Sequence, residues 1–230
     1  MAIPTELVRW FAKFGADDPD VAAKVASLAD FMRAMKYNGK RKMNLEALDI
    51  LLDGTSTDAR HVGRGGEPLF STNHASLANP SVSGSNLAVN LPFTETNVNF
   101  VINALSYQKD ENGAPIDSGD GWIILTGPAL ETKGWTMLNT EGKVGSADND
   151  KNYVYSRRSK IVHVVEPEID ADYLGWFVFN KKNGLFIKWM DRPYFEKEPT
   201  GKNNSIGYFM NMSGRAGWTK WRGTFASLPS

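Results

Sequence analysis

The stretch GGEPLFSTNH, Gly65 to His74, separates a helical first part of the chain from a β-rich remainder. Gly65, Gly66 and Pro68 set a turn, because proline lacks a backbone donor and glycine reaches conformations that other residues avoid. The Ser, Thr and Asn that follow can hydrogen-bond to their own backbone. The residues therefore predict a structured loop at the junction between the two parts of the chain.

A periodic pattern before this loop predicts one long helix over residues 19–53. Two aspartates precede Pro19, which gives an acidic N-cap followed by proline at the first helical position. Gly39 weakens the middle of the helix, and Gly54 is expected to cap its end. At 1.5 Å per residue the helix would be about 50 Å long and would lie across a surface as a strut. Apolar residues recur at spacings of four and three in its first part, namely Val21, Val25, Leu28, Met32 and Met35. The apolar pattern resumes after Gly39 with Met43, Leu45, Leu48 and Leu52.

The remainder predicts a second helix followed by several strands. Thr94 is the expected N-cap of a helix over residues 94–107, whose apolar residues repeat with the helical period. The connection 55–92 is rich in Gly, Ser, Asn and Pro, and its length suggests a functional loop or one draped over a neighbour. Short apolar runs bounded by Gly, Pro or Asn predict strands at 122–125, 161–165, 176–179, 185–190, 208–212 and 218–225.

The composition is that of an ordinary globular protein. The chain has 230 residues, of which 41% are hydrophobic, and its 26 basic and 26 acidic side chains leave no net charge. This argues against a dedicated nucleic-acid binder, which normally carries an excess of Lys and Arg. The absence of cysteine excludes disulfides, thiolate nucleophiles and Cys-ligated metal sites. No apolar run reaches the roughly 20 residues that span a bilayer, and no signal peptide is recognisable at the start, so we expect no membrane association.

The side chains that could support catalysis are sparse. The three histidines, His61, His74 and His163, have neither H-E-x-x-H nor i, i+4 spacing, and no serine lies in a nucleophile-elbow context. His163 lies within a run of valines, so we expect a hydrogen-bonded core or pleat-facing residue rather than a ligand. We therefore expect no enzymatic activity and no catalytic, cofactor-binding or metal-binding residue.

One acidic segment resembles part of a calcium-binding loop. Asp148, Asp150 and Asn152 give three alternating oxygen ligands. Tyr153 occupies the position at which the loop requires glycine, and no glutamate closes the loop. We therefore do not predict calcium binding there.

An ordered series of blocks resembles the major capsid proteins of tailed phages with the Hong Kong 97-type fold, and within them the Mu-like head subunit group. The resemblance covers most of the chain. It begins with the long helix that ends in GGEPLFSTNH and continues with the helix that leads into KDENGAPI at 109–116. The later blocks are ILTGPALE within 123–131, GSADND at 145–150, VVEP at 164–167 and GWTKWRGTFAS at 217–227.

This resemblance implies an α+β fold of the Hong Kong 97-like capsid class. Such a fold has a long spine helix, an elongated peripheral β-sheet and an axial α/β domain. Residues 19–92 with 185–215 would form the peripheral domain, and residues 93–184 with 216–230 the axial domain. Only the short segment 1–18 precedes the spine helix. We therefore expect either that the N-terminal arm and extended hairpin loop (E-loop) usual in the family belong to a portion outside this sequence, or that the shell locks its subunits in another way. The cross-linking lysine of some members cannot be assigned.

The function implied by the resemblance is structural. The chain would be a major capsid (head) protein that self-assembles, as pentamers and hexamers, into an icosahedral shell enclosing phage double-stranded DNA. Portal, scaffold and decoration proteins would be further partners, and contact with packaged DNA would be weak and non-specific. The protein would be assembled in the host cytoplasm and located in the virion, without a cofactor or a membrane.

Two alternatives remain open from the sequence. An encapsulin-like nanocompartment would share the fold and enclose a cargo enzyme. A β-rich carbohydrate-binding module would use exposed aromatic side chains, although the tryptophans in strand-like runs are expected to pack in the core instead. Those tryptophans are Trp122, Trp176, Trp189, Trp218 and Trp221.

The residues expected at a subunit interface lie in three places. Phe70 is the expected apolar anchor of the connection 63–90, and His74 lies in the same loop. Lys40 and Arg41 belong to a basic cluster in the middle of the long helix, which would face solvent or a partner. Trp10 is one of the aromatic residues of a short amphipathic segment near the N-terminus, with Leu7, Phe11 and Phe14.

Overall fold

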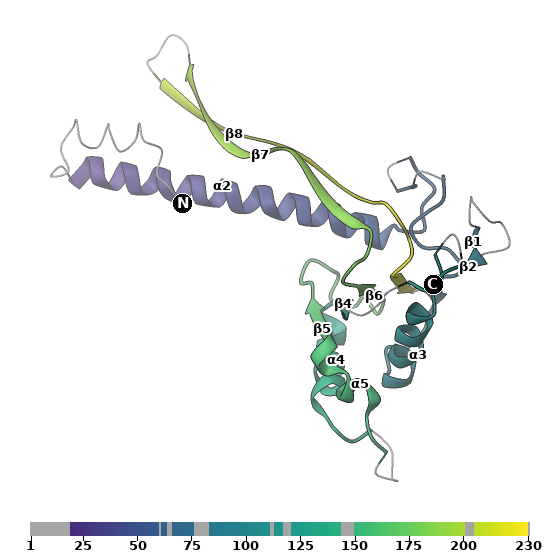
Figure 1. Ribbon diagram of the computed structural model, residues 1–230. Coiled ribbons are helices and arrows are strands. Elements are labelled where there is room, and N and C mark those ends of the chain that lie inside the picture. The colour runs from purple at the N-terminus through teal and green to yellow at the C-terminus, as the bar shows by residue number, and fades with distance from the viewer. Residues whose placement is uncertain are drawn as a thin grey trace. The chain divides into compact units, whose positions relative to one another are not determined.

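The computed structural model describes residues 19–59, 61–63, 66–75, 83–110, 113–116, 121–143, 150–200 and 205–229. The protein is mixed α+β, as the sequence indicates, and Figure 1 shows the elements in chain order. The segment 1–18, with Trp10, lies outside the described residues, and so do the side chains of the apolar stripe before Met43. No helix of the described residues is long and apolar enough to cross a membrane.

The described chain divides into two compact units. Unit 1 combines the helical residues up to Glu46 with Ile187–Arg215, and unit 2 combines Ala47–Phe186 with the C-terminal segment from Ala216. By this division residues 47–92 lie in unit 2.

The long helix is continuous. Helix α2 spans Pro19–Leu52, 34 residues, which corresponds to about 51 Å at 1.5 Å per residue. The weak point expected at Gly39 is not a break, because Gly39 is buried and strand β8 packs against it. A Cβ at this position would lie 2.8 Å from both Met210 Cε and Met212 Sδ. The glycine thus allows close approach of the strand, which offsets its low helix propensity.

Unit 1 contains, besides this helix, most of a two-stranded ribbon. Strands β7 (Leu185–Thr200) and β8 (Ser205–Trp218) pair with each other (Figure 1). Met43 on α2 is buried close to Gly214, which also lies beside Trp189. Both strands are longer than the sequence predicts, because a ribbon covered on one side tolerates charged residues, such as the exposed Asp191, on its other side.

Unit 2 is built on a five-stranded mixed sheet with the order β3-β9-β6-β4-β5. Its strands are β3 (Leu87–Val89), β4 (Trp122–Thr126), β5 (Ile161–Val165), β6 (Trp176–Asn180) and β9 (Thr224–Leu228). The pairs β3–β9 and β4–β5 are parallel, and β6 is antiparallel to both of its neighbours. A separate pair, β1 (His74–Ala75) and β2 (Ser83–Gly84), is antiparallel.

One predicted strand is wrong in position. Residues 218–225 are not a single strand, since β8 ends at Trp218, a turn follows, and β9 begins at Thr224. Gly223 lies in the turn with φ +81°, a backbone conformation that favours glycine. Trp218, Trp221 and Phe225 continue through this turn, so the aromatic content of the segment conceals it.

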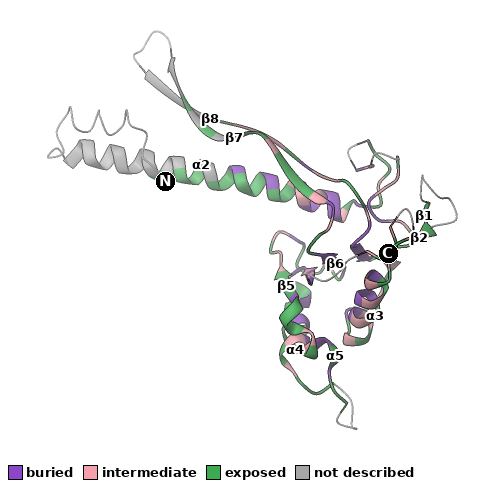
Figure 2. Cartoon of the chain, in the orientation of Figure 1, coloured by how far each residue is buried: buried purple, intermediate pink, exposed green. Residues whose placement is uncertain are grey.

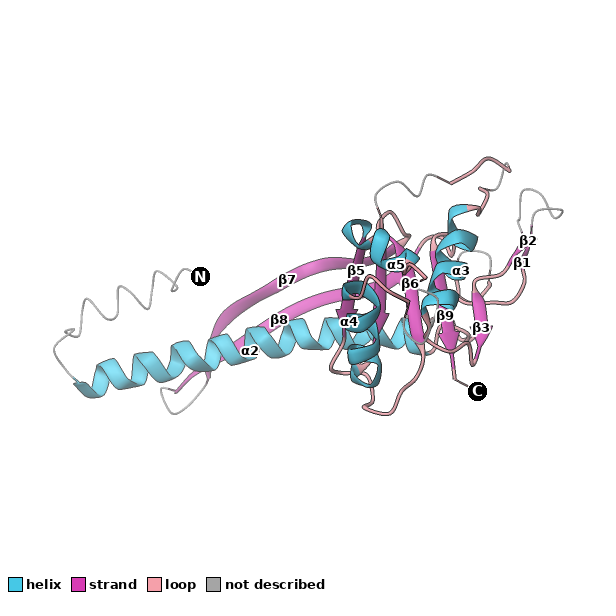
Figure 3. Cartoon of the chain, turned by 90° about the horizontal axis from the view of Figure 1, so that it is seen from below, coloured by secondary structure: helices cyan, strands magenta, loops and turns pink. Residues whose placement is uncertain are grey.

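The central strand β6 is buried on both of its faces (Figure 2). On one face Trp176 and Val178 of β6 pack with apolar residues of α3 (Glu95–Ser106), α4 (Glu131–Asn139) and α5 (Tyr153–Ser156). Figure 3 shows these helices grouped beside the sheet. On the other face Phe177 and Phe179 pack with the end of α2 and with Leu69 and Phe70. This second core is why residues 47–92 belong to unit 2.

Helix α3 forms where the sequence predicts it, and its N-cap is confirmed. Thr94 Oγ1 accepts a hydrogen bond from the backbone N–H of Asn97 at 3.3 Å. The block ILTGPALE covers the end of β4, a 3-10 turn (η1, Pro128–Leu130) and the first residue of α4. A second 3-10 turn, η2 (Arg158–Lys160), precedes β5. Helix α4 itself is not among the helices that apolar periodicity predicts.

Two substitutions in α3 test the assignment of its buried face. Ile102 is 1% exposed and Phe100 is 61% exposed. Ile102→Ala should lower the free energy of unfolding of the unassembled subunit by about 2–5 kcal/mol, because it leaves a cavity. Phe100→Ala should change it by less than about 0.5 kcal/mol. Urea unfolding followed by circular dichroism measures both, and equal effects would contradict the assignment.

Candidate self-association surface

Unit 1 exposes several large apolar side chains. On the ribbon Met190 is 76% exposed and Tyr194 is about half exposed, and on α2 Tyr37 is 68% exposed. Leu45, which the sequence places on the buried stripe, is also exposed, so that assignment is wrong. Unit 2 also exposes large apolar side chains, among them Tyr107 and Trp135, so exposure alone does not distinguish unit 1. Exposed apolar residues that lie near one another can form protein–protein contact surfaces.

One face of α2 carries part of this surface. Tyr37, Arg41 and Leu45 follow one another at i, i+4 spacing, so they lie along one side of the helix. Gly39 and Met43, which contact or approach the ribbon, lie on the opposite side. All three residues of the first set are exposed. The surface is therefore mixed, with a guanidinium between two apolar side chains.

The ribbon offers a second kind of contact. Strands of 16 and 14 residues pair with each other and with no further strand of the described chain. Each strand thus has one edge whose backbone donors and acceptors lack a neighbouring strand. Long edges of this kind are templates for pairing with another chain.

Of the described residues that we expect at an interface, two are exposed and two are buried within their own chain. Lys40 and Arg41 are exposed on α2, as an interface or a solvated face requires. Trp10 lies outside the described residues. Phe70 and His74 are buried within their own chain, and they are corrected below.

Phe70 is a core residue. It is 1% exposed and packs in the second core of unit 2, with its ring centroid 5.8 Å from that of Phe177. Its backbone N–H donates to Gly54 O at 2.8 Å, and a Cβ at Gly54 would overlap the Phe70 ring. Gly54 therefore serves close packing rather than the expected helix cap. Because the Phe70 side chain has no accessible surface, it cannot anchor a neighbouring subunit.

His74 is held in a buried polar network. Its ring nitrogens lie 3.0 Å from Glu67 Oε2 and 3.0 Å from Asn86 Oδ1, and its ring stacks on Trp221 at a centroid distance of 4.3 Å. Asn86 also binds three other groups, namely Leu69 O, Thr224 Oγ1 and the backbone N–H of Ser71. This network fixes the loop from Glu67 to His74 inside unit 2, which explains why His74 is not at the surface.

His163 agrees with its prediction as a hydrogen-bonded, pleat-facing residue. Its Nε2 lies 2.9 Å from Thr126 Oγ1, on the neighbouring strand. The ring lies against Gly134 of α4, where a Cβ would overlap it. Burial lowers the pKa of the His163 imidazole, and the nearby Glu131 carboxylate opposes this shift. The expected role in packing is confirmed.

The structure also locates Asn152 of the calcium-like segment and two of the tryptophans considered for sugar stacking. Asn152 caps α5 by accepting from the Tyr155 N–H at 3.0 Å, and it donates to Met137 O at 2.7 Å, so its amide is engaged in the fold. Asp148 lies outside the described residues. Trp122 and Trp176 are buried, as expected, which removes them from any sugar-stacking face.

Sequence reasoning missed one group that could hold a metal. Asp49, Asp53 and His61 bring one nitrogen and two carboxylate oxygens close together. The available signal was the pair of aspartates four residues apart at the end of the long helix, followed by a histidine eight residues later.

Comparisons with known proteins give only distant likeness. No protein-family model and no curated protein matches the chain. A chain in the crystal structure of a virus-like particle from Pyrococcus furiosus is similar at a TM-score of 0.35 and 10% identity, over 62% of this chain and 56% of that chain. A chain in the procapsid of satellite phage P4, which includes the size determination protein, is similar at a TM-score of 0.35 and 13% identity, over 100% and 69%. These scores are too low to decide the family or the function.

The burial of Phe70 predicts the effect of a polar substitution. Phe70→Ser should lower the free energy of unfolding of the subunit by about 3–5 kcal/mol, because it leaves a cavity and buries a hydroxyl in the second core. Phe186→Ser is the matched control, since Phe186 is 42% exposed. Circular dichroism with urea unfolding measures both. If the Phe70→Ser subunit is as stable as the Phe186→Ser subunit, Phe70 is not a core residue.

The lowered pKa of His163 predicts a contribution to stability that depends on pH. Since the unfolded imidazole titrates near its ordinary value of about 6.5, the contribution is present above that pH. It is lost as the pH falls through the folded-state pKa. His163→Gln should therefore reduce the loss of stability between about pH 7.5 and about pH 5. Urea unfolding at both pH values measures it, and an unchanged loss would argue against this role.

Proposed function

We propose that this chain is a structural, non-enzymatic subunit that self-assembles into an icosahedral shell enclosing phage double-stranded DNA. The observation that carries the proposal is the construction of unit 1. A single helix and a two-stranded ribbon leave apolar side chains and two long strand edges uncovered. An isolated two-stranded ribbon is marginally stable in water, so neighbouring copies that cover it would stabilise it.

Repeated contacts of this kind suit a closed shell. Each copy would contact several neighbours through α2 and the ribbon, so many modest interfaces would sum to a stable particle. Pentamers and hexamers of the chain would be the building units. The protein would be located in the virion after assembly in the host cytoplasm.

The two units would have different roles in assembly. Unit 1 would correspond to the peripheral domain, and unit 2 to the axial domain around the symmetry axes. Lys40 and Arg41 would contact a neighbouring subunit or, weakly, the packaged DNA. Portal, scaffold and decoration proteins would be further partners of the shell.

Electron microscopy of the expressed full chain distinguishes this proposal from its alternatives. Shells that package DNA in infected or co-expressing cells support a capsid protein. Small shells that contain a protein cargo would instead identify a nanocompartment. Dispersed monomers at high concentration, with saturable binding to glycans, would identify a carbohydrate-binding module and refute shell assembly.

A charge placed on the ribbon should block assembly without unfolding the subunit. Met190→Glu should reduce the yield of particles at least about tenfold, because the carboxylate would be desolvated at each copy of the interface. Leu174→Glu introduces the same charge at an exposed apolar residue of unit 2 and is the control. Sedimentation and particle counts give the yield, and circular dichroism checks the fold. Normal assembly of Met190→Glu would remove this part of the ribbon from the interface.

A further inference from the structure

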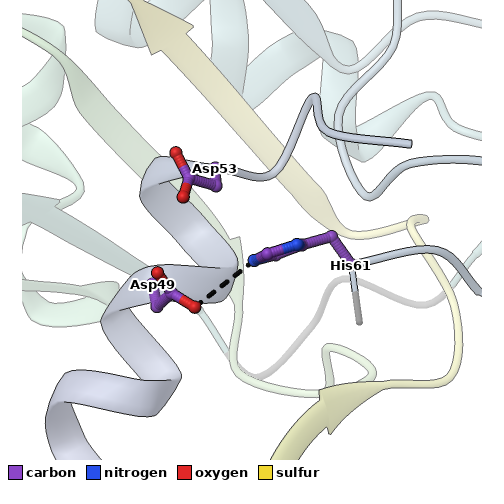
Figure 4. Close-up of side chains that lie close together, drawn as sticks. All are labelled: Asp49, Asp53 and His61. Atoms are coloured by element: carbon purple, nitrogen blue, oxygen red, sulfur yellow. Dashed lines mark ion pairs between the residues drawn. The ribbon is translucent and has the colours of Figure 1, made fainter. Parts of the chain in front are cut away.

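The end of α2 and the loop after it bring together three potential metal ligands within unit 2. Asp49 and Asp53 are four residues apart, so their carboxylates project from the same side of the last helical turns. His61 follows after a turn and points back toward both of them (Figure 4). Each residue offers one ligand atom, and these three atoms lie within 4.8 Å of one another.

The environment of His61 distinguishes this group from an ordinary acidic cluster. Its side chain is buried, with the residue 7% exposed, and neither ring nitrogen has a hydrogen-bond partner. Its Nε2 lies 3.4 Å from Asp49 Oδ2, close but without hydrogen-bond geometry. A buried imidazole without a hydrogen-bond partner is costly, and a ligand placed between it and the carboxylates would remove that cost.

Hydrogen bonds and packing fix the backbone around His61, so its imidazole ring has a defined position. The His61 N–H donates to Asp58 O at 2.8 Å, and the Trp218 indole N–H donates to His61 O at 3.1 Å. Gly63 lies against the face of the same indole, where a Cβ would overlap it. These contacts hold the imidazole on the side that faces the two aspartates.

We propose that Asp49, Asp53 and His61 bind one divalent transition-metal cation of the zinc type. Ligand atoms about 2.0–2.1 Å from a tetrahedral zinc ion are separated by about 3.3–3.4 Å. The distance of 3.4 Å between His61 Nε2 and Asp49 Oδ2 matches this edge. The Asp53 carboxylate, on an exposed residue whose ligand oxygen lies within 4.8 Å of the other two ligand atoms, would supply a third corner.

The ligand set indicates the class of metal. One imidazole and two carboxylates suit Zn²⁺, Co²⁺, Ni²⁺ or Mn²⁺, whereas Mg²⁺ and Ca²⁺ prefer oxygen ligands alone. Two carboxylates also balance the charge of a divalent ion. A water molecule would take the fourth position on the exposed side. Because His61 Nδ1 has no hydrogen-bond partner to orient the ring, micromolar affinity is expected rather than nanomolar.

The consequence of binding would be structural. The cation would connect the last turns of α2 to the loop that leads to Glu67 and the buried network around His74. It would thus stabilise unit 2 where the long helix ends. This inference does not depend on shell assembly, since all three ligands belong to one subunit.

Titration of the full, untagged chain with zinc chloride tests the site, after removal of metals with a chelator. Calorimetry should give one saturable site per chain with a micromolar dissociation constant. Cobalt chloride should produce the visible absorption bands of tetrahedral Co²⁺ with the same stoichiometry. Zinc at about 100 times its dissociation constant should raise the melting temperature by about 5 to 10 °C.

Asp53→Asn is the decisive variant, because this exposed side chain can change without loss of fold. It should weaken zinc binding at least about tenfold and remove most of the melting-temperature increase. Asp58→Asn, an exposed aspartate in the same loop, is the matched control and should bind as the wild type does. His61→Gln should also abolish the cobalt bands. Absence of saturable binding to the wild type, or equal binding by Asp53→Asn and Asp58→Asn, would overturn the proposal and leave only an ion pair between His61 and Asp49.

Discussion

Unit 2 depends on the burial of strand β6 on both faces. Trp176 and Val178 pack into one core and Phe177 and Phe179 into the other, so the sheet is stable only if both sides are covered. Helices α3, α4 and α5 cover the first side. The second side is covered by the end of α2 and by the loop that contains Phe70. This requirement explains why a loop of polar and glycine-rich sequence is fixed in the core.

Unit 1 differs from unit 2 because its ribbon is covered on one side only. Its helix and ribbon approach each other closely at Gly39 and Gly214, and among the described side chains Tyr37, Met190 and Tyr194 are exposed. A construction of this kind gains stability from contact with other chains. The contrast between a sheet buried on both faces and a ribbon covered on one face is the physical basis for proposing a shell subunit.

The candidate metal site could be predicted from the sequence only in part. Asp49 and Asp53 share a helix face by their spacing alone, so their proximity follows from local structure. His61 is separated from them by a turn whose path the residues do not specify. Its position depends on Trp218, which is remote in sequence and donates to the His61 carbonyl. The burial that leaves its ring nitrogens without partners is therefore a tertiary property.

The sequence by itself determined the elements whose signals are local. The long helix, the Thr94 cap and strands β4, β5 and β6 follow from apolar period, capping chemistry and β-branched or aromatic runs. Tertiary structure decided the features that depend on distant residues. The sequence alone indicates that Phe70 is a loop residue, but in the fold it packs against Phe177. It likewise indicates that His74 is exposed, but in the fold Asn86 and Trp221 contact its ring. Local sequence records the conformation that a segment prefers, whereas burial depends on which segments the fold brings together.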